Sequence, residues 1–255
     1  MTKRDIQLTR RKALAGAGAI GFATVGMGRG RPTASWDEYT DYTYAESDAP
    51  SRLLVGWRSM YNDALVGESP TDSIDSVDEI DGGIRLVDLD DVLPGDTGSA
   101  SVGLRLDDEG GMVPDGARVW MQIAEPEGVS LFEDPASRAL ADRIEIDIRY
   151  DTGLLGVRRC AGAEDQFVHF GEEIFSGTVD GLVSGDVAAG IELDPGLFDN
   201  GCLTPEERRC LTFVWRFPTG GGNAGKGGTI DFDVTFHAVS CEVTENPFKN
   251  VNGVA

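Results

Sequence analysis

Four cysteines are the residues of this chain whose types and spacing most directly suggest chemistry. They are Cys160, Cys202, Cys210 and Cys241. In an exported domain an even number of cysteines predicts two disulfides. Zinc is the alternative that four thiolates allow, but the spacings contain no C-x-x-C pair, which disfavours a zinc site. We therefore expect two disulfide bonds and no metal centre.

The partner of Cys241 depends on how the last strands fold. From Cys210 onward, apolar and polar residues alternate in two runs that flank the glycine-rich segment 220–227. This alternation predicts two strands joined as a long antiparallel hairpin with a flexible tip. Such a hairpin places Cys241 beyond Cys210, nearer the chain that enters the first strand. Because a disulfide needs its Cα atoms within about 7 Å, Cys202 is favoured over Cys210 as the partner of Cys241.

The remaining residues indicate no catalytic site. The two histidines, His169 and His237, lie in strand-like runs, and His237 falls on the polar face of the last strand. The chain has no H-E-x-x-H or G-x-S-x-G motif. We therefore expect neither an enzyme nor a cofactor, and both histidines read as ordinary strand residues. The acidic run within 64–83 lacks the close ligand spacing of a calcium loop, so it predicts a solvated loop.

Residues 1–34 read as a signal peptide rather than as part of the fold. Arg10 and Arg11 precede an apolar run of small residues that is too short to span a bilayer comfortably. The paired arginines indicate twin-arginine export, with the Sec pathway and an uncleaved anchor as alternatives. This predicts an extracellular or cell-surface protein that meets a signal peptidase and contacts the membrane transiently through its leader.

The strongly acidic composition indicates which classes of molecule the protein can bind. Lys and Arg total 22 and Asp and Glu total 44, for a formal net charge of −22, and only four of the basic residues are lysine. A dense carboxylate surface stays hydrated in concentrated salt, where charge repulsion is screened. This is typical of a halophile. The same charge repels nucleic acid and anionic lipid, so neither is expected as a partner.

The hydrophobic pattern predicts an all-β fold. About eight or nine short strands separated by turn signals indicate a single jelly-roll-like antiparallel β-sandwich over 51–245. One or two short helices are expected, at 134–141 with Asp134 as its N-cap and within 177–190. An acidic N-terminal arm, 35–50, precedes the sandwich, and a flexible tail, 246–255, follows it.

Several segments in order resemble one family. They are LTRRKALAGAGAIG, LLVGWRSMYNDA, LPGDTGSASVGLRL, RVWMQI, IEIDIRYD, EEIFSGTVDGL and the run from Cys210 to Cys241 before NPF. Together they resemble haloarchaeal proteins with SipW-dependent-type signal peptides, a group similar to TasA and camelysin. The resemblance covers most of the chain after residue 50.

The resemblance implies an exported jelly-roll subunit of fibres, pili or biofilm matrix that associates with itself or with paralogous subunits. It also implies donor-strand complementation, in which the N-terminal segment of one subunit completes the sheet of its neighbour. The donor in this chain would come from the arm, which carries Trp36, Tyr39, Tyr42 and Tyr44. Two alternatives stay open: a calcium- or glycan-binding module that uses the loop 107–116, and a camelysin-like metalloprotease.

Overall fold

The computed structural model describes residues 43–47, 53–68, 84–89, 92–106, 116–125, 134–152, 162–163, 171–194, 201–220 and 225–249. Its strands are β1 (Thr43–Ser47), β2 (Leu53–Tyr61), β3 (Ala64–Glu68), β4 (Ile84–Leu89), β5 (Thr97–Leu106), β6 (Ala117–Ala124), β7 (Glu145–Tyr150), β8 (Glu173–Thr178), β9 (Ile191–Glu192), β10 (Cys202–Leu203), β11 (Arg209–Arg216) and β12 (Ile230–Ser240). The helices are α2 (Pro135–Ala141), α3 (Val179–Ser184), α4 (Asp186–Ala189) and the 3-10 turn η4 (Pro247–Lys249).

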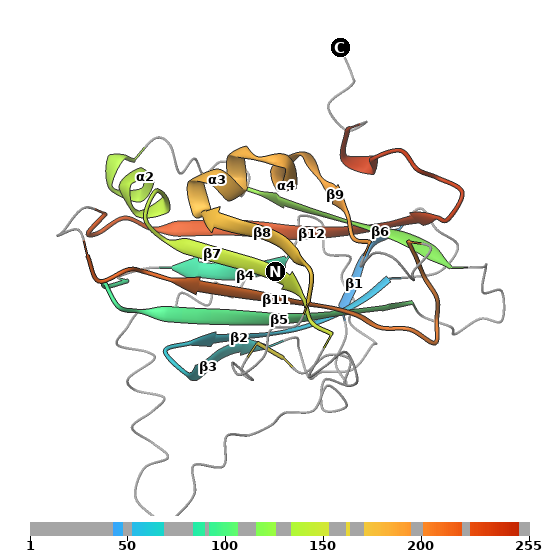
Figure 1. The fold of residues 1–255 in the computed structure, drawn as a ribbon, viewed down its shortest axis with the longest axis horizontal. Helices are drawn as coiled ribbons and strands as arrows, with labels where there is room; N and C mark the ends of the chain where they lie inside the picture. Colours follow the sequence, from blue (N-terminus) through green and yellow to red (C-terminus); the bar gives the residue numbers. More distant parts are fainter. Residues whose placement is uncertain are drawn as a thin grey trace, which may run out of the picture.

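The strands form two antiparallel sheets that pack together (Figure 1). Sheet A has the order β3-β2-β5-β11-β7-β8. Sheet B is built around β12, which pairs with β6 on one side and with β4 on the other, while β9 and β10 pair with the outer edge of β6. This confirms the expected mostly-β sandwich with few short helices.

Strand β1 joins the two sheets into one hydrogen-bonded series. It pairs antiparallel with β2, where Thr43 faces Val55, and parallel with β12, where Glu46 faces His237. The segment that contains Tyr44 therefore forms a strand within the arm expected at 35–50. The segment expected to be a signal peptide, with Arg10 and Arg11, lies outside the described residues, as do Trp36, Tyr39 and Tyr42.

The predicted hairpin of the last two strands is wrong. β11 pairs with β5 and β7 in sheet A, whereas β12 pairs with β6, β4 and β1 in sheet B. Alternation establishes which face of a strand is apolar, but it does not say which strand lies beside it. The glycine-containing connection therefore crosses from one sheet to the other, and the apolar faces of β11 and β12 belong to the same core.

Two further segments differ from expectation. The segment expected to be a solvated loop begins with β3, which pairs with β2 through a tight turn at Asn62 and Asp63. Both turn residues have positive φ, 46° and 65°, a conformation that Asn and Asp tolerate better than most residues. The glycine-rich segment within 177–190 forms two short helices, α3 and α4, rather than one.

The core lies between the sheets and is closed at one side by the helices. Its largest fully buried side chains include Phe213 of β11 and Phe232 and Phe236 of β12. Leu140 of α2 and Leu182 of α3 belong to the same cluster. The two apolar strand faces seen in the sequence thus meet as the two halves of one core, which is the arrangement that removes most apolar surface from water.

The end of the glycine-rich connection packs tightly on α2. A Cβ atom at Gly228 would lie 2.5 Å from the carbonyl oxygen of Ala136, so a side chain there would collide with the helix backbone. The amide of Thr229 also donates to Ser137 Oγ, at 3.0 Å. Gly225 and Gly228 therefore allow a close approach between this connection and the backbone of α2, beyond the flexibility expected of a hairpin tip.

Asp134 makes the start of α2 sensitive to pH. Its carboxylate accepts hydrogen bonds from the hydroxyl and the amide of Ser137, at 2.7 and 2.8 Å. These two bonds, the hydroxyl first, lower the pKa of Asp134 below its usual value of 3.8. A lowered folded-state pKa means that this cap stabilises the protein above about pH 4 and that the contribution is lost as the pH falls through the lowered value.

We expect Asp134→Asn to weaken this acid dependence while keeping the helix capped, because Asn is also a good N-cap. The measurement is the midpoint of urea unfolding for both proteins at pH 6 and at pH 3. The drop in midpoint between the two pH values should be smaller in the variant. An equal drop in both proteins would show that Asp134 contributes nothing to the acid sensitivity.

Among the described residues, no helix is long and apolar enough to cross a membrane.

Candidate functional site

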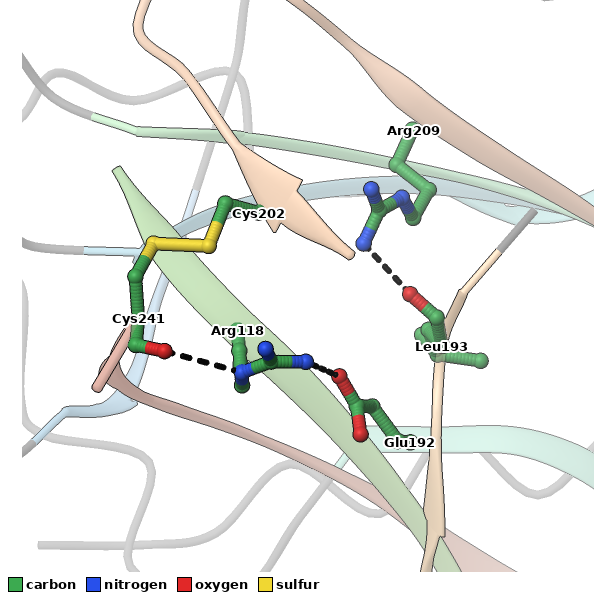
Figure 2. Close-up of polar contacts among 6 residues, drawn as sticks. All are labelled: Arg118, Glu192, Leu193, Cys202, Arg209 and Cys241. Atoms are coloured by element: carbon green, nitrogen blue, oxygen red, sulfur yellow. Dashed lines mark hydrogen bonds and ion pairs between the residues drawn. A yellow bond between two sulfur atoms is a disulfide. The ribbon is translucent and has the colours of Figure 1, made fainter. Parts of the chain in front are cut away.

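Polar groups and a disulfide gather where β9 and β10 meet β6 and the end of β12 (Figure 2). We name this cluster the arginine–disulfide node; it consists of Arg118, Glu192, Cys202 and Cys241. Backbone pairing brings its parts together, since Cys202 lies opposite Arg118 and Glu192 lies opposite Trp120 along one edge of β6. The node is thus built by sheet register from segments far apart in the chain.

Arg118 connects three segments of the node. Its Nε atom donates to the carbonyl oxygen of Cys241 at 3.0 Å, and its Nη1 atom pairs with Glu192 Oε1 at 2.5 Å. A Cβ atom at Gly201 would lie 2.8 Å from Arg118 Nη1, so the chain entering β10 also lies against the guanidinium. Both charged side chains are about one-quarter exposed or less. Their pairing is therefore less screened by solvent than that of a fully exposed ion pair.

Cys202 and Cys241 form a disulfide with Cα atoms 5.8 Å apart. This is the pairing favoured from the sequence, although the hairpin used to reach it does not exist. The bond passes beside Gly116 at the start of β6, because a Cβ atom at Gly116 would lie 3.4 Å from both Cys202 Cβ and Cys241 Sγ. Cys210 is also disulfide-bonded, and the one further cysteine of the sequence, Cys160, lies outside the described residues.

Next to the node, Arg209 links the two sheets. This arginine belongs to β11 of sheet A, is 4% exposed, and donates a hydrogen bond to the carbonyl oxygen of Leu193, which follows β9 (Figure 2). Tyr150 lies nearby and is buried. Burial raises the pKa of its hydroxyl far above the usual range, and the positive charge of Arg209 acts in the opposite direction. Tyr150 therefore stays uncharged at neutral pH.

The outer face of sheet B beside the node is largely covered. His237, expected on a wet face, is 7% exposed, and its ring forms a T-shaped contact with the ring of Phe248, with centroids 6.1 Å apart. Its neighbour on β6, Trp120, is 8% exposed, and among the described residues its indole Nε1 has no hydrogen-bond partner. The prediction for His237 was wrong because residues after Cys241 return over this face.

The described part of the chain contains no group of three or more His, Cys, Asp or Glu residues that could hold a metal ion. His169 and the loop 107–115 lie outside the described residues. Within the described part, the reactive bond of the node is the disulfide, which can exchange with thiols. The arginines there can hold carbonyl and carboxylate oxygens in place.

Sequence reasoning found the two cysteines of the node and missed Arg118, Glu192 and Arg209. Arg118 and Glu192 are 74 positions apart and Arg118 and Cys241 are 123 positions apart, so no local spacing joins them. In an acidic chain, an arginine on the polar side of a predicted strand is interpreted as a solvent-exposed residue without a specific partner. Finding these residues requires knowing that β9 and β10 pair with β6, and in which register, which the sequence does not show.

No family model matches the chain, and neither a curated protein nor a solved structure matches it.

Proposed function

We propose that this protein is an exported structural subunit with jelly-roll topology, which assembles with copies of itself or paralogous subunits into extracellular fibres. The observation that carries the proposal is the place of β1 between the sheets. β1 pairs antiparallel with three residues of β2 and parallel with two residues of β12. The other strand pairs of the described sheets are antiparallel.

A short strand with few backbone pairs is suited to exchange between copies. The same edges of β2 and β12 can accept the corresponding strand of a second subunit, because backbone groups do not distinguish one chain from another. Exchange of identical elements is a low-cost route to assembly. In this proposal, residues 43–47 of one subunit take the place of β1 in the next subunit. The donor then extends past Tyr44, the last tyrosine of the arm, to Ser47.

Charge favours assembly in concentrated salt. A net charge of −22 makes neighbouring copies repel one another. At an ionic strength of about 1 M the screening length falls to roughly 3 Å, which removes most of that repulsion between exposed groups. We therefore expect fibres in molar salt and dissociation after dialysis to low salt, as seen by negative-stain electron microscopy and light scattering.

A cysteine pair tests strand exchange directly. Tyr44 lies opposite Leu54 in the β1–β2 pair, and opposite residues of an antiparallel pair are close enough to form a disulfide. Copies that carry Tyr44→Cys are mixed with mass-tagged copies that carry Leu54→Cys, under assembly conditions and mild oxidation. We expect a covalent dimer that contains one copy of each variant.

The matched control replaces Leu54→Cys by Met60→Cys, which lies six positions further along the same strand and should give no dimer with Tyr44→Cys. A cross-link that forms only when both substitutions are in one chain, and never between copies, would mean that β1 stays in its own subunit. Strand exchange would then be rejected.

A further inference from the structure

The C-terminal residues form a strap over the outer face of sheet B. We define the C-terminal strap as residues 242–249; it leaves the end of β12, turns back and ends in η4 on the side of β9 (Figure 1). The side-chain amide of Asn246 donates to the carbonyl oxygens of Ala189 and Gly190, at 3.0 and 2.8 Å. These bonds attach the far end of the strap to the end of α4.

The receiving site is shaped for the strap. Gly190 has a φ of 90°, and a Cβ atom there would lie 2.5 Å from the ring of Phe248. The amide of Phe248 donates to Asn246 Oδ1 at 2.9 Å, which holds the ring in place against His237. Asn246 and Phe248 therefore dock as one unit on Gly190 and the face of sheet B.

The near end of the strap is held by the arginine–disulfide node. Cys241 immediately precedes the strap, its sulfur is bonded to Cys202, and its carbonyl oxygen accepts from Arg118. Arg118 also pairs with Glu192 in β9, two residues after Gly190. The far end of the strap is thus attached to Ala189 and Gly190, and the near end is linked through Arg118 to Glu192, two residues further along the same segment. The disulfide is the covalent cross-link among these attachments.

We propose that the Cys202–Cys241 disulfide is a redox-sensitive clasp whose reduction releases the C-terminal strap while the sandwich stays folded. The reductant is a dithiol. Its first thiolate attacks one sulfur of the clasp and forms a mixed disulfide, and its second thiolate displaces that sulfur. The net reaction transfers two electrons and two protons, so Cys202 and Cys241 become thiols and the dithiol becomes a disulfide.

We expect reduction of the Cys202–Cys241 bond to free the strap without unfolding the sandwich because of where this bond lies. It lies beside Gly116, at the start of β6, whereas the core strands β5, β11 and β7 pair along their lengths within sheet A. Among the described residues, the strap is attached through the hydrogen bonds of Asn246 and the contact between the rings of Phe248 and His237. Segments with few buried contacts open at lower free energy than central strands.

Hydrogen exchange measured by mass spectrometry on the full-length protein tests the clasp. The wild type in its oxidised form is compared with the double variant Cys202→Ser/Cys241→Ser, which leaves the bond of Cys210 unchanged. We expect the hydrogen-bonded amides of the strap, those of Val243, Phe248 and Lys249, to exchange at least about tenfold faster in the variant, a change of roughly 1.4 kcal/mol in local opening. Amides of β11 should change less than about twofold, within the scatter expected for a region not coupled to the strap.

Arg118→Met provides a second test that keeps the disulfide. This variant should also speed exchange of the strap and leave β11 unchanged, because it removes the hydrogen bond to Cys241 and the ion pair with Glu192. Asn246→Ala is the positive control, since it frees the far end of the strap directly. In the wild type, a dithiol titration should expose the thiols of Cys202 and Cys241 in parallel with faster exchange of the strap.

Two outcomes would overturn the clasp. In the first, strap exchange is unchanged in the cysteine double variant while Asn246→Ala speeds it, whatever the effect of Arg118→Met. In the second, the strap and β11 lose protection together when the bond is removed or reduced, which would make the disulfide a support of the whole fold. Neither result depends on fibre formation. The clasp can therefore be rejected without rejecting the proposed function, and the proposed function without rejecting the clasp.

Discussion

Phe213→Ala lowers the free energy of unfolding by about 3–5 kcal/mol, the range observed when a large buried aromatic is truncated. Phe213 is fully buried in β11, between Ala100 of β5 and Ile148 of β7. β11 is an inner strand of sheet A, paired on both sides, so the surrounding side chains have little room to move into the cavity. The loss of buried area and the unfilled cavity therefore add.

Urea unfolding in molar salt, followed by circular dichroism, measures this effect. Val214→Ala is the matched control, because Val214 is the next residue of the same strand, faces away from the core and is half-buried. The control should cost less than about 1.5 kcal/mol, since it removes two methyl groups from a partly exposed side chain. Similar losses in the two variants would contradict the assignment of Phe213 to the centre of the core.

Asp96→Ala lowers the free energy of unfolding by about 3 kcal/mol, because it leaves several partly buried donors without their acceptor. Asp96 follows the Pro-Gly turn and is 9% exposed. Its Oδ2 atom accepts from the Tyr61 hydroxyl and the Leu93 amide, at 2.6 and 2.8 Å, and its Oδ1 atom accepts from Asn62 Nδ2 at 2.9 Å. One carboxylate thus joins the β2–β3 turn to the loop that leads into β5.

Asp96→Asn should be nearly as damaging as Asp96→Ala. An amide at this position directs an N–H₂ group at one of the donors, and Asn62 cannot simply turn over because its Oδ1 atom accepts from the Thr97 amide. Asp63→Asn in the same turn is the control; Asp63 is exposed, its φ is 65°, and Asn tolerates that conformation well. Urea unfolding should place the control within about 0.5 kcal/mol of wild type. Full stability of Asp96→Asn would show that the negative charge and the second acceptor atom are dispensable.

Local patterns predicted most of the strands and their faces. From Ile144, just before β7, isoleucines alternate with charged residues, and the burial of Ile144, Ile146 and Ile148 follows that alternation. The start of α2 was predicted from Asp134 followed by proline, and Asp134 caps it. These features depend on residues within one turn or one strand, so the chain encodes them locally.

Partners of strands could not be predicted in the same way. β11 and β12 each have one apolar face, which is equally consistent with a hairpin and with two strands that face each other across a core. β3 was missed because Ala64–Glu68 has weak alternation and stands beside an acidic run. Its pairing follows from the positive-φ turn at Asn62 and Asp63, a signal that was present in the sequence as Asn-Asp.

The amino-acid sequence by itself determined an acidic, mostly-β chain, the faces that enter its core, and four cysteines, of which Cys202 and Cys241 were the favoured pair. Tertiary structure alone decided that β11 and β12 lie in different sheets, and that Arg118 reaches both Glu192 and the carbonyl of Cys241. The physical reason is the sequence separation of the residues involved. Periodicity and capping depend on residues a few positions apart. Strand order and the arginine–disulfide node depend on contacts between segments up to 123 positions apart.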